Sequence, residues 1–220
     1  MTQSGRQPFD DSALSGPMAE VVRRVSMAGF ASLWHGRPLS VAELVDGDGG
    51  PPAAAVEHLR RQGRIELSDD GLVVAVHGLC RRPTAHRIEH DRGVINTWCA
   101  FDVIGIPAAL AIDARATTLC PTCRAALSVK LAAGEPEPLP GAVLWYPEVS
   151  GGHLVNDFCS GANLFCSAAH LERWADARPA SGSVLTIAEV AELGRAGWAD
   201  AAHHLRTGWP AGDPWPPMSC

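Results

Sequence analysis

The chain has 220 residues, which is enough to bury a sizeable core as one domain or as one domain with a small additional module. Its hydrophobic fraction of 46% and charged fraction of 19% are typical of a globular protein, and its net charge of −6 argues against non-specific binding to nucleic acid or to a membrane surface. The sequence has no apolar run of transmembrane length, and its polar N-terminus does not resemble a signal peptide. We therefore expect a cytoplasmic protein in a reducing compartment.

The first third of the chain has the pattern of a small helical module. Residues 1–15 are predicted to be a disordered leader, and residues 16–80 are predicted to form the module. Apolar periodicity, capping residues and turn signals predict three helices followed by a β-hairpin, an order typical of a winged-helix-like module. The helices are expected from Pro17 to about Trp34, from the Ser40–Glu43 capping box, and from Pro51 or Pro52 to Gly63, and the strands at 64–67 and 72–76.

A winged-helix pattern raises the possibility of DNA binding, but the charge of this segment opposes it. Residues 1–80 contain seven Arg and Lys against ten Asp and Glu, which gives a net charge of −3, the wrong sign for a phosphate-binding face. The third helix begins with Pro-Pro-Ala-Ala-Ala, although recognition helices usually read bases from their N-terminal residues. We therefore expect a packing or lid module and no nucleic-acid partner.

The stretch from Asn96 to Asp102, Asn-Thr-Trp-Cys-Ala-Phe-Asp, is the most informative part of the chain. Thr97 is predicted to cap a short helix, which places Cys99 and Asp102 three residues apart on one helical face, where their side chains can meet. Pro107 is expected to end this helix.

The position of these two side chains suggests a reactive pair. A thiol at a helix N-terminus is pushed toward thiolate, because the helix dipole and the free N–H groups favour negative charge. The same field would keep Asp102 ionised, whereas burial among apolar neighbours would push its pKa upward. The pair is a candidate nucleophile and proton carrier, and the alternative is a capped core helix that contains a buried cysteine.

Short strands and helices follow without a regular repeat, which favours an α+β fold. Taken with the first third of the chain, this pattern predicts a winged-helix-like N-terminal module followed by a mixed α/β-sheet catalytic core. The later segments are expected as a polar connector at 81–95, strands at 126–131 and 142–146, a Gly-rich turn at Ser150–His153, helices at Ala168–Arg178 and Thr186–Leu205, and a Pro- and Trp-rich tail from Thr207.

The seven cysteines are more consistent with ligands or nucleophiles than with a disulfide framework. Cys120 and Cys123 form a C-x-x-C pair, and Cys159 and Cys166 follow downstream. Four thiolates would suit a tetrahedral zinc site, although the spacing of the second pair is wider than usual. Buried structural thiols are the alternative. Thioredoxin-like chemistry fits poorly, because a strand is predicted to follow the C-x-x-C pair rather than a helix.

The stretch from Asn96 to Asp102, together with Phe158-Cys159 and Phe165, closely resembles the organomercurial (alkylmercury) lyases. Cys120 falls where that family often has a further cysteine. The resemblance covers about residues 17–206 and includes the pattern of the last helices, at Glu172, Trp174, Leu193-Gly194 and His204-Leu205. Family members carry a small winged-helix-like N-terminal part, so the resemblance implies that residues 81–220 form an alkylmercury-lyase-like catalytic domain.

The resemblance implies cleavage of a carbon–mercury bond by protonolysis, which yields a hydrocarbon and Hg(II). Carried over by position, Cys99 and Cys159 would be the thiolates that capture mercury, and Asp102 would complete the mercury site as the proton shuttle. Mercury is a soft cation that prefers thiolate ligands. The resemblance further implies a small organomercurial substrate, no organic cofactor, Hg(II) bound as product, a cytosolic thiol as co-reactant, and a mercuric reductase as a possible recipient of Hg(II).

Some features of this chain depart from the family pattern. The four residues after Cys159 are small or polar, where the family commonly has bulky and His-containing residues. Cys123 and Cys166 look additional, and they could add mercury affinity, bind zinc or do nothing. Two alternatives stay open: a lyase-fold enzyme that acts on a non-mercury substrate, and a thiol-based metal-sensing DNA-binding protein.

Overall fold

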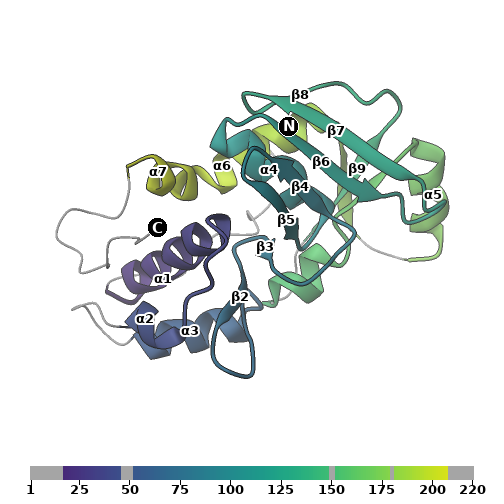
Figure 1. Cartoon of the computed structure of the whole chain (residues 1–220). Helices are drawn as coiled ribbons and strands as arrows, with labels where there is room; N and C mark the ends of the chain where they lie inside the picture. Colours follow the sequence, from purple (N-terminus) through teal and green to yellow (C-terminus); the bar gives the residue numbers. More distant parts are fainter. Residues whose placement is uncertain (1–16, 46–51, 149–151, 179–180, 208–220) are drawn as a thin grey trace.

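A computed structural model describes residues 17–45, 52–148, 152–178 and 181–207 (Figure 1). The predicted leader, part of the predicted turn at 150–153 and the tail after Thr207 lie outside the described residues. Among the helices of the described residues, none is long and apolar enough to cross a membrane.

The N-terminal elements agree with the sequence prediction. They are α1 (Pro17–Trp34), α2 (Val41–Val45), α3 (Pro52–Arg61), β1 (Ile65–Leu67) and β2 (Val73–Val76), and β1 and β2 pair as an antiparallel hairpin. The Ser40–Glu43 capping box forms as predicted: the Ser40 N–H donates to Glu43 Oε2 at 2.7 Å, and the Glu43 N–H donates to Ser40 Oγ at 3.2 Å. Gly63 ends the third helical segment with a φ of +61°, a conformation that glycine adopts without strain.

The hairpin is continuous with a large antiparallel sheet in the order β1-β2-β3-β5-β4-β6-β7-β8. Its further strands are β3 (Leu79–Cys80), β4 (Arg87–His90), β5 (Gly93–Thr97), β6 (Ala114–Leu119), β7 (Ala126–Ala132) and β8 (Glu135–Pro136). The expectation that 81–95 is only a connector is therefore wrong. Its charged side chains point away from the core, while Ile88 is fully buried and pairs with Ile95, so the polar composition concealed a half-buried strand pair.

A second, three-stranded sheet has the order β10-β9-β11 and packs with α5. These elements are β9 (Val143–Pro147), β10 (Asn163–Phe165), α5 (Ala168–Asp176) and β11 (Gly182–Leu185). Helix α4 (Ala100–Leu110) contacts strands of both sheets, and every residue from Ala100 to Ala108 is buried. The site-bearing helix therefore lies at the centre of an α+β fold, which confirms the predicted class.

Two details of α4 differ from the prediction. Cys99, not Thr97, is the N-cap, because Thr97 is still part of β5 and its hydroxyl donates to the Cys99 carbonyl at 3.2 Å. Pro107 lies inside the helix, which continues to Leu110. A proline at this position removes one backbone hydrogen bond without preventing the last turn.

The single long helix predicted at 186–205 is two helices, α6 (Ile187–Gly197) and α7 (Ala199–Thr207). The break falls at Trp198, whose side chain is fully buried and whose indole N–H donates to the His77 carbonyl at 2.9 Å. Helix α6 packs on α4 through two glycines, because a Cβ on Gly194 would collide with the backbone of Gly105. The two glycines therefore let the helices approach backbone to backbone, and the Trp198 ring packs on Gly105 beside this contact.

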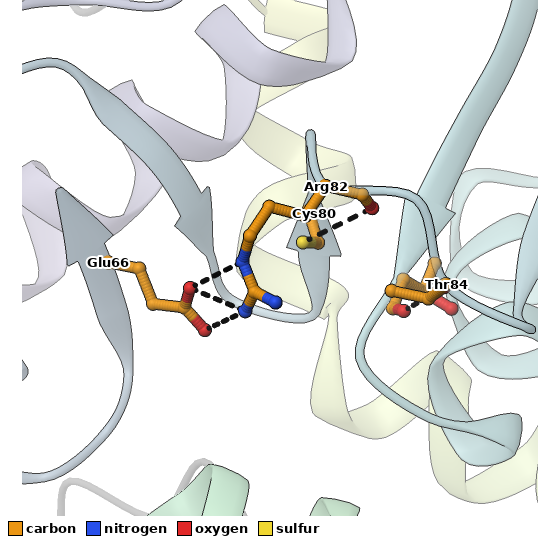
Figure 2. Close-up of polar contacts among 5 residues, drawn as sticks. Glu66, Cys80, Arg82 and Thr84 are labelled. Atoms are coloured by element: carbon orange, nitrogen blue, oxygen red, sulfur yellow. Dashed lines mark hydrogen bonds and ion pairs between the residues drawn. The ribbon is translucent and has the colours of Figure 1, made fainter. Parts of the chain in front are cut away.

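Polar contacts hold the segment that leads into α4. Arg82 Nη2 lies 2.7 Å from the Glu66 carboxylate and joins β1 to the loop after β3 (Figure 2). In the same loop, Thr84 Oγ1 lies 2.9 Å from the carbonyl oxygens of both His86 and Thr97. The end of β5 is therefore fixed by the loop that crosses it.

Candidate active site

Cys99 lies where β5 passes into α4, and its backbone is extended, with φ −150° and ψ 177°. Its N–H donates to Asp102 Oδ2 at 3.0 Å, while the Asp102 N–H faces the Cys99 sulfur, so the two residues form a capping box. Both side chains are completely buried. Cys99 and Asp102 therefore lie in contact, as predicted, and Cys99 is the N-cap of the helix.

Cys159 reaches the same place from a different part of the chain. It ends a π-helical turn, η1 (Val155–Cys159), that is closed by the Ser160 N–H donating to the Val155 carbonyl at 3.1 Å. The ligand atoms of Cys99, Asp102 and Cys159 all lie within 4.8 Å of one another. The structure thus brings all three predicted site residues together.

Both thiols of the site have a pKa above the ordinary value for cysteine. Burial raises the pKa of Cys99 well above its ordinary value, and the hydrogen bond with Cys159 and the nearby Asp102 carboxylate raise it further. The pKa of Cys159 is also raised: the hydrogen bond from Cys99 lowers it, but burial and Asp102 outweigh that effect. The expected push of the Cys99 thiol toward thiolate is wrong in direction, because burial of the charged form outweighs the effect of the helix N-terminus and raises the pKa.

Asp102 is a carboxyl group that can carry a proton near neutral pH. Burial raises its pKa to about 7, although hydrogen bonds from the Cys99 thiol and from the backbone of Cys99 and Trp98 act in the opposite direction. Among the described residues, its buried Oδ1 has no hydrogen-bond partner. An unpartnered buried carboxylate oxygen is costly unless it holds a proton or meets a ligand. This oxygen is therefore available to hold a proton beside the thiols.

Aromatic side chains enclose the three residues. The Phe101 ring packs edge-to-face on Tyr146 and on Phe158, with centroid separations of 5.3 and 5.6 Å. Burial, and then the neighbouring Cys99, raise the pKa of the Tyr146 hydroxyl, so Tyr146 stays neutral. These rings keep water away from the site and strengthen the electrostatic interactions inside it.

Sequence reasoning missed a glycine that packs against the carboxyl group. Gly78 has a φ of +95°, and a Cβ built on it would lie 3.2 Å from Asp102 Cγ and from the Trp198 ring. Only a residue without a side chain allows this close approach. The glycine was visible in the sequence shortly after the predicted strand at 72–76, but no local pattern indicated which side chain it would face.

The N-terminal helices contact the segment that carries Cys159. The Leu154 N–H donates to the Gln62 carbonyl at 2.7 Å, and the His153 ring packs directly on Gly63, where a Cβ would collide with it. The end of α3 therefore supports the start of the π-helical turn.

A second cluster contains Cys120, Cys123, Cys166 and His170, whose ligand atoms also lie within 4.8 Å of one another. The predicted set of four thiolates is wrong in one residue. Cys159 lies with Cys99, and His170 is the fourth residue of this cluster. Burial raises the pKa of Cys120, but hydrogen bonds from backbone N–H groups and from His170 outweigh it and bring the pKa to about 6. His170 follows Cys166 by four residues, the only sequence signal that could have identified it.

The sequence of this chain matches a known protein family. The alkylmercury lyase (MerB) profile matches residues 79–199, more than half of the chain. The chain belongs to the alkylmercury lyase family. An alkylmercury lyase of Staphylococcus epidermidis is 26% identical over 168 residues, covering 74% of this chain and 76% of that protein. An alkylmercury lyase of Pseudomonas putida is 25% identical over 172 residues, covering 77% and 81%.

A solved structure has the same fold. The crystal structure of the mercury-bound form of MerB2 superposes with a TM-score of 0.74 at 19% identity, covering 82% of this chain and 91% of that one. The resemblance of this chain to the alkylmercury lyases is therefore confirmed, and so is the expectation of a carbon–mercury lyase at the level of the family.

Proposed function

We propose that the chain cleaves carbon–mercury bonds of small organomercurials by protonolysis, with Cys99, Asp102 and Cys159 as the reacting groups. The observation that carries this proposal is the enclosed trio of two thiols and one carboxyl with all ligand atoms within 4.8 Å of one another. Two soft sulfur donors can hold one mercury atom, and the carboxyl group beside them can move one proton.

The substrate, carried as the thiol adduct R–Hg–SR′, first meets Cys159. Cys159 is 7% exposed and Cys99 is fully buried, so Cys159 is the accessible thiol. Exchange forms the Cys159 S–Hg bond, breaks the bond between mercury and the carrier sulfur, and transfers the Cys159 proton to the departing R′SH. Mercury then holds R and one protein thiolate.

Cys99 adds the second sulfur. The hydrogen bond between its thiol and Asp102 sets the path of the proton: the Asp102 carboxylate takes it while the Cys99 sulfur bonds to mercury. A second thiolate on mercury raises electron density on the attached carbon. The carbon–mercury bond then breaks, its electron pair stays with carbon, and the Asp102 proton completes the hydrocarbon R–H.

After this step Asp102 is again a carboxylate, and Hg(II) is held between Cys99 and Cys159. Two molecules of a small thiol would exchange with the two protein sulfurs and return a proton to each. The supply of such thiols favours the cytosol as the compartment of the reaction, and a mercuric reductase is the natural recipient of the released Hg(II). No step calls for an organic cofactor.

The helical N-terminal segment has the helix–helix–helix–hairpin order that suggests a winged-helix-like module, and we include this assignment in the proposal, with residues 81–220 as the catalytic domain. Its contact with the Cys159 segment supports a packing role. The net charge of −3 over residues 1–80 speaks against DNA binding. A metal sensor needs thiolates but no buried proton carrier, so Asp102 also favours an enzyme.

The decisive experiment is hydrocarbon release from phenylmercury or methylmercury by purified protein in excess thiol, compared with Cys99→Ser. Release of benzene or methane by the unmodified protein, but not by Cys99→Ser, supports the proposal. Tight mercury binding without hydrocarbon release would contradict it and would favour a family relative that acts on a different substrate.

A further inference from the structure

The second cysteine cluster gathers residues from three parts of the chain. Cys120 and Cys123 lie in the turn that joins β6 to β7, Cys166 follows β10, and His170 lies in the first turn of α5. Cys120 is fully buried, Cys166 is half-buried and Cys123 is exposed. None of these four residues takes part in the chemistry proposed above.

The separations within the cluster suit one tetrahedral ion. Cys123 Sγ lies 3.7 Å from Cys166 Sγ, and His170 Nδ1 lies 3.0 Å from Cys166 Sγ and 3.7 Å from Cys120 Sγ. Zinc bonds of about 2.3 Å to sulfur and about 2.0–2.1 Å to nitrogen, set at tetrahedral angles, place two sulfurs about 3.8 Å apart and a sulfur and a nitrogen about 3.5 Å apart. The side chains therefore need only small rotations to share an ion.

The backbone holds the donors in place by contacts that do not involve sulfur. The Arg124 N–H donates to the Cys120 carbonyl at 2.8 Å, and the Cys120 N–H donates to the Ala125 carbonyl at 2.9 Å, so the C-x-x-C turn is closed. The Thr122 hydroxyl donates to the His170 carbonyl at 2.8 Å and ties this turn to α5. Ser167 caps the same helix by accepting from the His170 N–H at 3.3 Å.

We propose that Cys120, Cys123, Cys166 and His170 bind one Zn²⁺ as a closed structural site. Three thiolates and one neutral imidazole form a Cys₃His set, which zinc binds in structural sites with no position left for a substrate. Binding transfers the thiol protons to solvent and leaves the redox state of sulfur unchanged. The ion would join the β6–β7 turn to the β10–α5 junction, and β10 begins four residues after Cys159.

The test measures metal directly and is independent of mercury chemistry. Full-length protein, purified without chelators and never exposed to mercury, should contain one zinc per chain by mass spectrometry of the metal. Replacement by Co²⁺ should give thiolate-to-cobalt charge-transfer absorption and tetrahedral d–d bands. Cys123→Ser and His170→Gln should each lose the stoichiometric zinc. Cys123 is exposed, so its replacement leaves the core intact even if a Cys120 variant fails to fold.

Cys99→Ser is the matched control, since it removes a buried thiol of the other cluster and should retain the zinc. Zinc absent from the unmodified protein after incubation with Zn²⁺, or zinc retained by the Cys123→Ser/His170→Gln double variant, would overturn the proposal. Zinc lost from Cys99→Ser would move the metal to the catalytic site and overturn it as well. A Cys123–Cys166 disulfide in protein prepared under reducing conditions would also contradict it.

Discussion

The Ala100 N–H donates a hydrogen bond of 3.1 Å to the Ala162 carbonyl. Ala100 follows Cys99 directly, and Ala162 lies three residues beyond Cys159, so one backbone bond joins the two segments that carry the thiols. Both alanines are fully buried. The approach of Cys99 to Cys159 therefore depends on the main chain, and a side-chain replacement at either cysteine should leave the other in place.

Replacement of one thiol at a time tests this arrangement. Cys99→Ser and Cys159→Ser should each abolish hydrocarbon release, because a serine hydroxyl is a poor ligand for soft mercury. Each variant should still bind mercury through its remaining cysteine, measured by titration with phenylmercury. Hydrocarbon release at the unmodified rate by either variant would remove that cysteine from the mechanism.

Asp102→Asn separates mercury capture from proton transfer. The amide keeps the shape of the side chain but cannot carry the proton, so kcat should fall by about 10²–10⁴-fold, the range expected for loss of a general acid. Affinity for phenylmercury should change little, because both sulfurs remain. Single-turnover release of benzene measures the chemical step, and an unchanged rate would contradict the assignment of Asp102 as the proton carrier.

The pKa of about 7 at Asp102 predicts the pH dependence of the reaction. The carboxylate form accepts the thiol proton, and its fraction in the free enzyme falls tenfold per pH unit below that pKa. A plot of kcat/KM against pH should therefore decline below about pH 7. The residual kcat/KM of Asp102→Asn should not show this decline. A decline that persists in the variant would be due to another titrating group.

The same shift predicts how stability varies with pH. Folding raises the pKa of Asp102 from 3.8 to about 7, so the folded state binds the proton more tightly than the unfolded state. The stabilisation that this tighter proton binding gives the folded state is complete below about pH 3.8 and is lost as the pH rises through about 7. The free energy of unfolding of the unmodified protein, relative to Asp102→Asn, should decline between these values and level off above pH 7. Urea titrations across this range measure it, and a flat difference would contradict the shift.

The contact between α3 and the π-helical turn predicts an effect at a distance. Gly63→Ala should displace the His153 ring and slow hydrocarbon release, because His153 and Leu154 begin the turn that ends in Cys159. Gly36→Ala is the control: Gly36 has a similar positive φ of +72° but nothing within 4 Å of its Cβ position. Equal rates in the two variants would mean that backbone strain alone accounts for any loss.

The glycine contact between α4 and α6 predicts a loss of stability. Gly194→Ala places a methyl group on the backbone of Gly105, and the helices must separate to accept it. We expect the free energy of unfolding to fall by about 1–3 kcal/mol, typical of an overpacked core. Gly152→Ala, at an exposed position with open space around its Cβ, should have little effect in the same urea titration.

Local patterns predicted much of this fold because their cause is local. The capping boxes at Ser40 and Thr186 mark helix starts that form as expected, since each is satisfied within four residues. The pairing of β3 with β5, and the turn of the chain at Trp198, depend on partners far away in sequence. No periodicity within one segment reports such contacts.

The grouping of Cys99, Asp102 and Cys159 was predictable only because a family pattern supplied Cys159. Spacing on a helix brought Cys99 and Asp102 together, but nothing local linked them to a cysteine about sixty residues later. The protonation states were not accessible to the same reasoning. They depend on how completely the site is buried, which the helix position of Cys99 does not indicate.

The strand order of the large sheet also determines where the chain can be shortened without exposing a strand edge. In the described part of that sheet, strand β3 joins the β1–β2 hairpin to β5. A shortened protein that began at residue 81 would lose all three strands and leave the end of β5, at Asn96 and Thr97, without its partner strand. Such an edge readily recruits a strand from another molecule. Strand β3 therefore covers the end of β5, and we expect residues 81–220 to aggregate when they are produced alone.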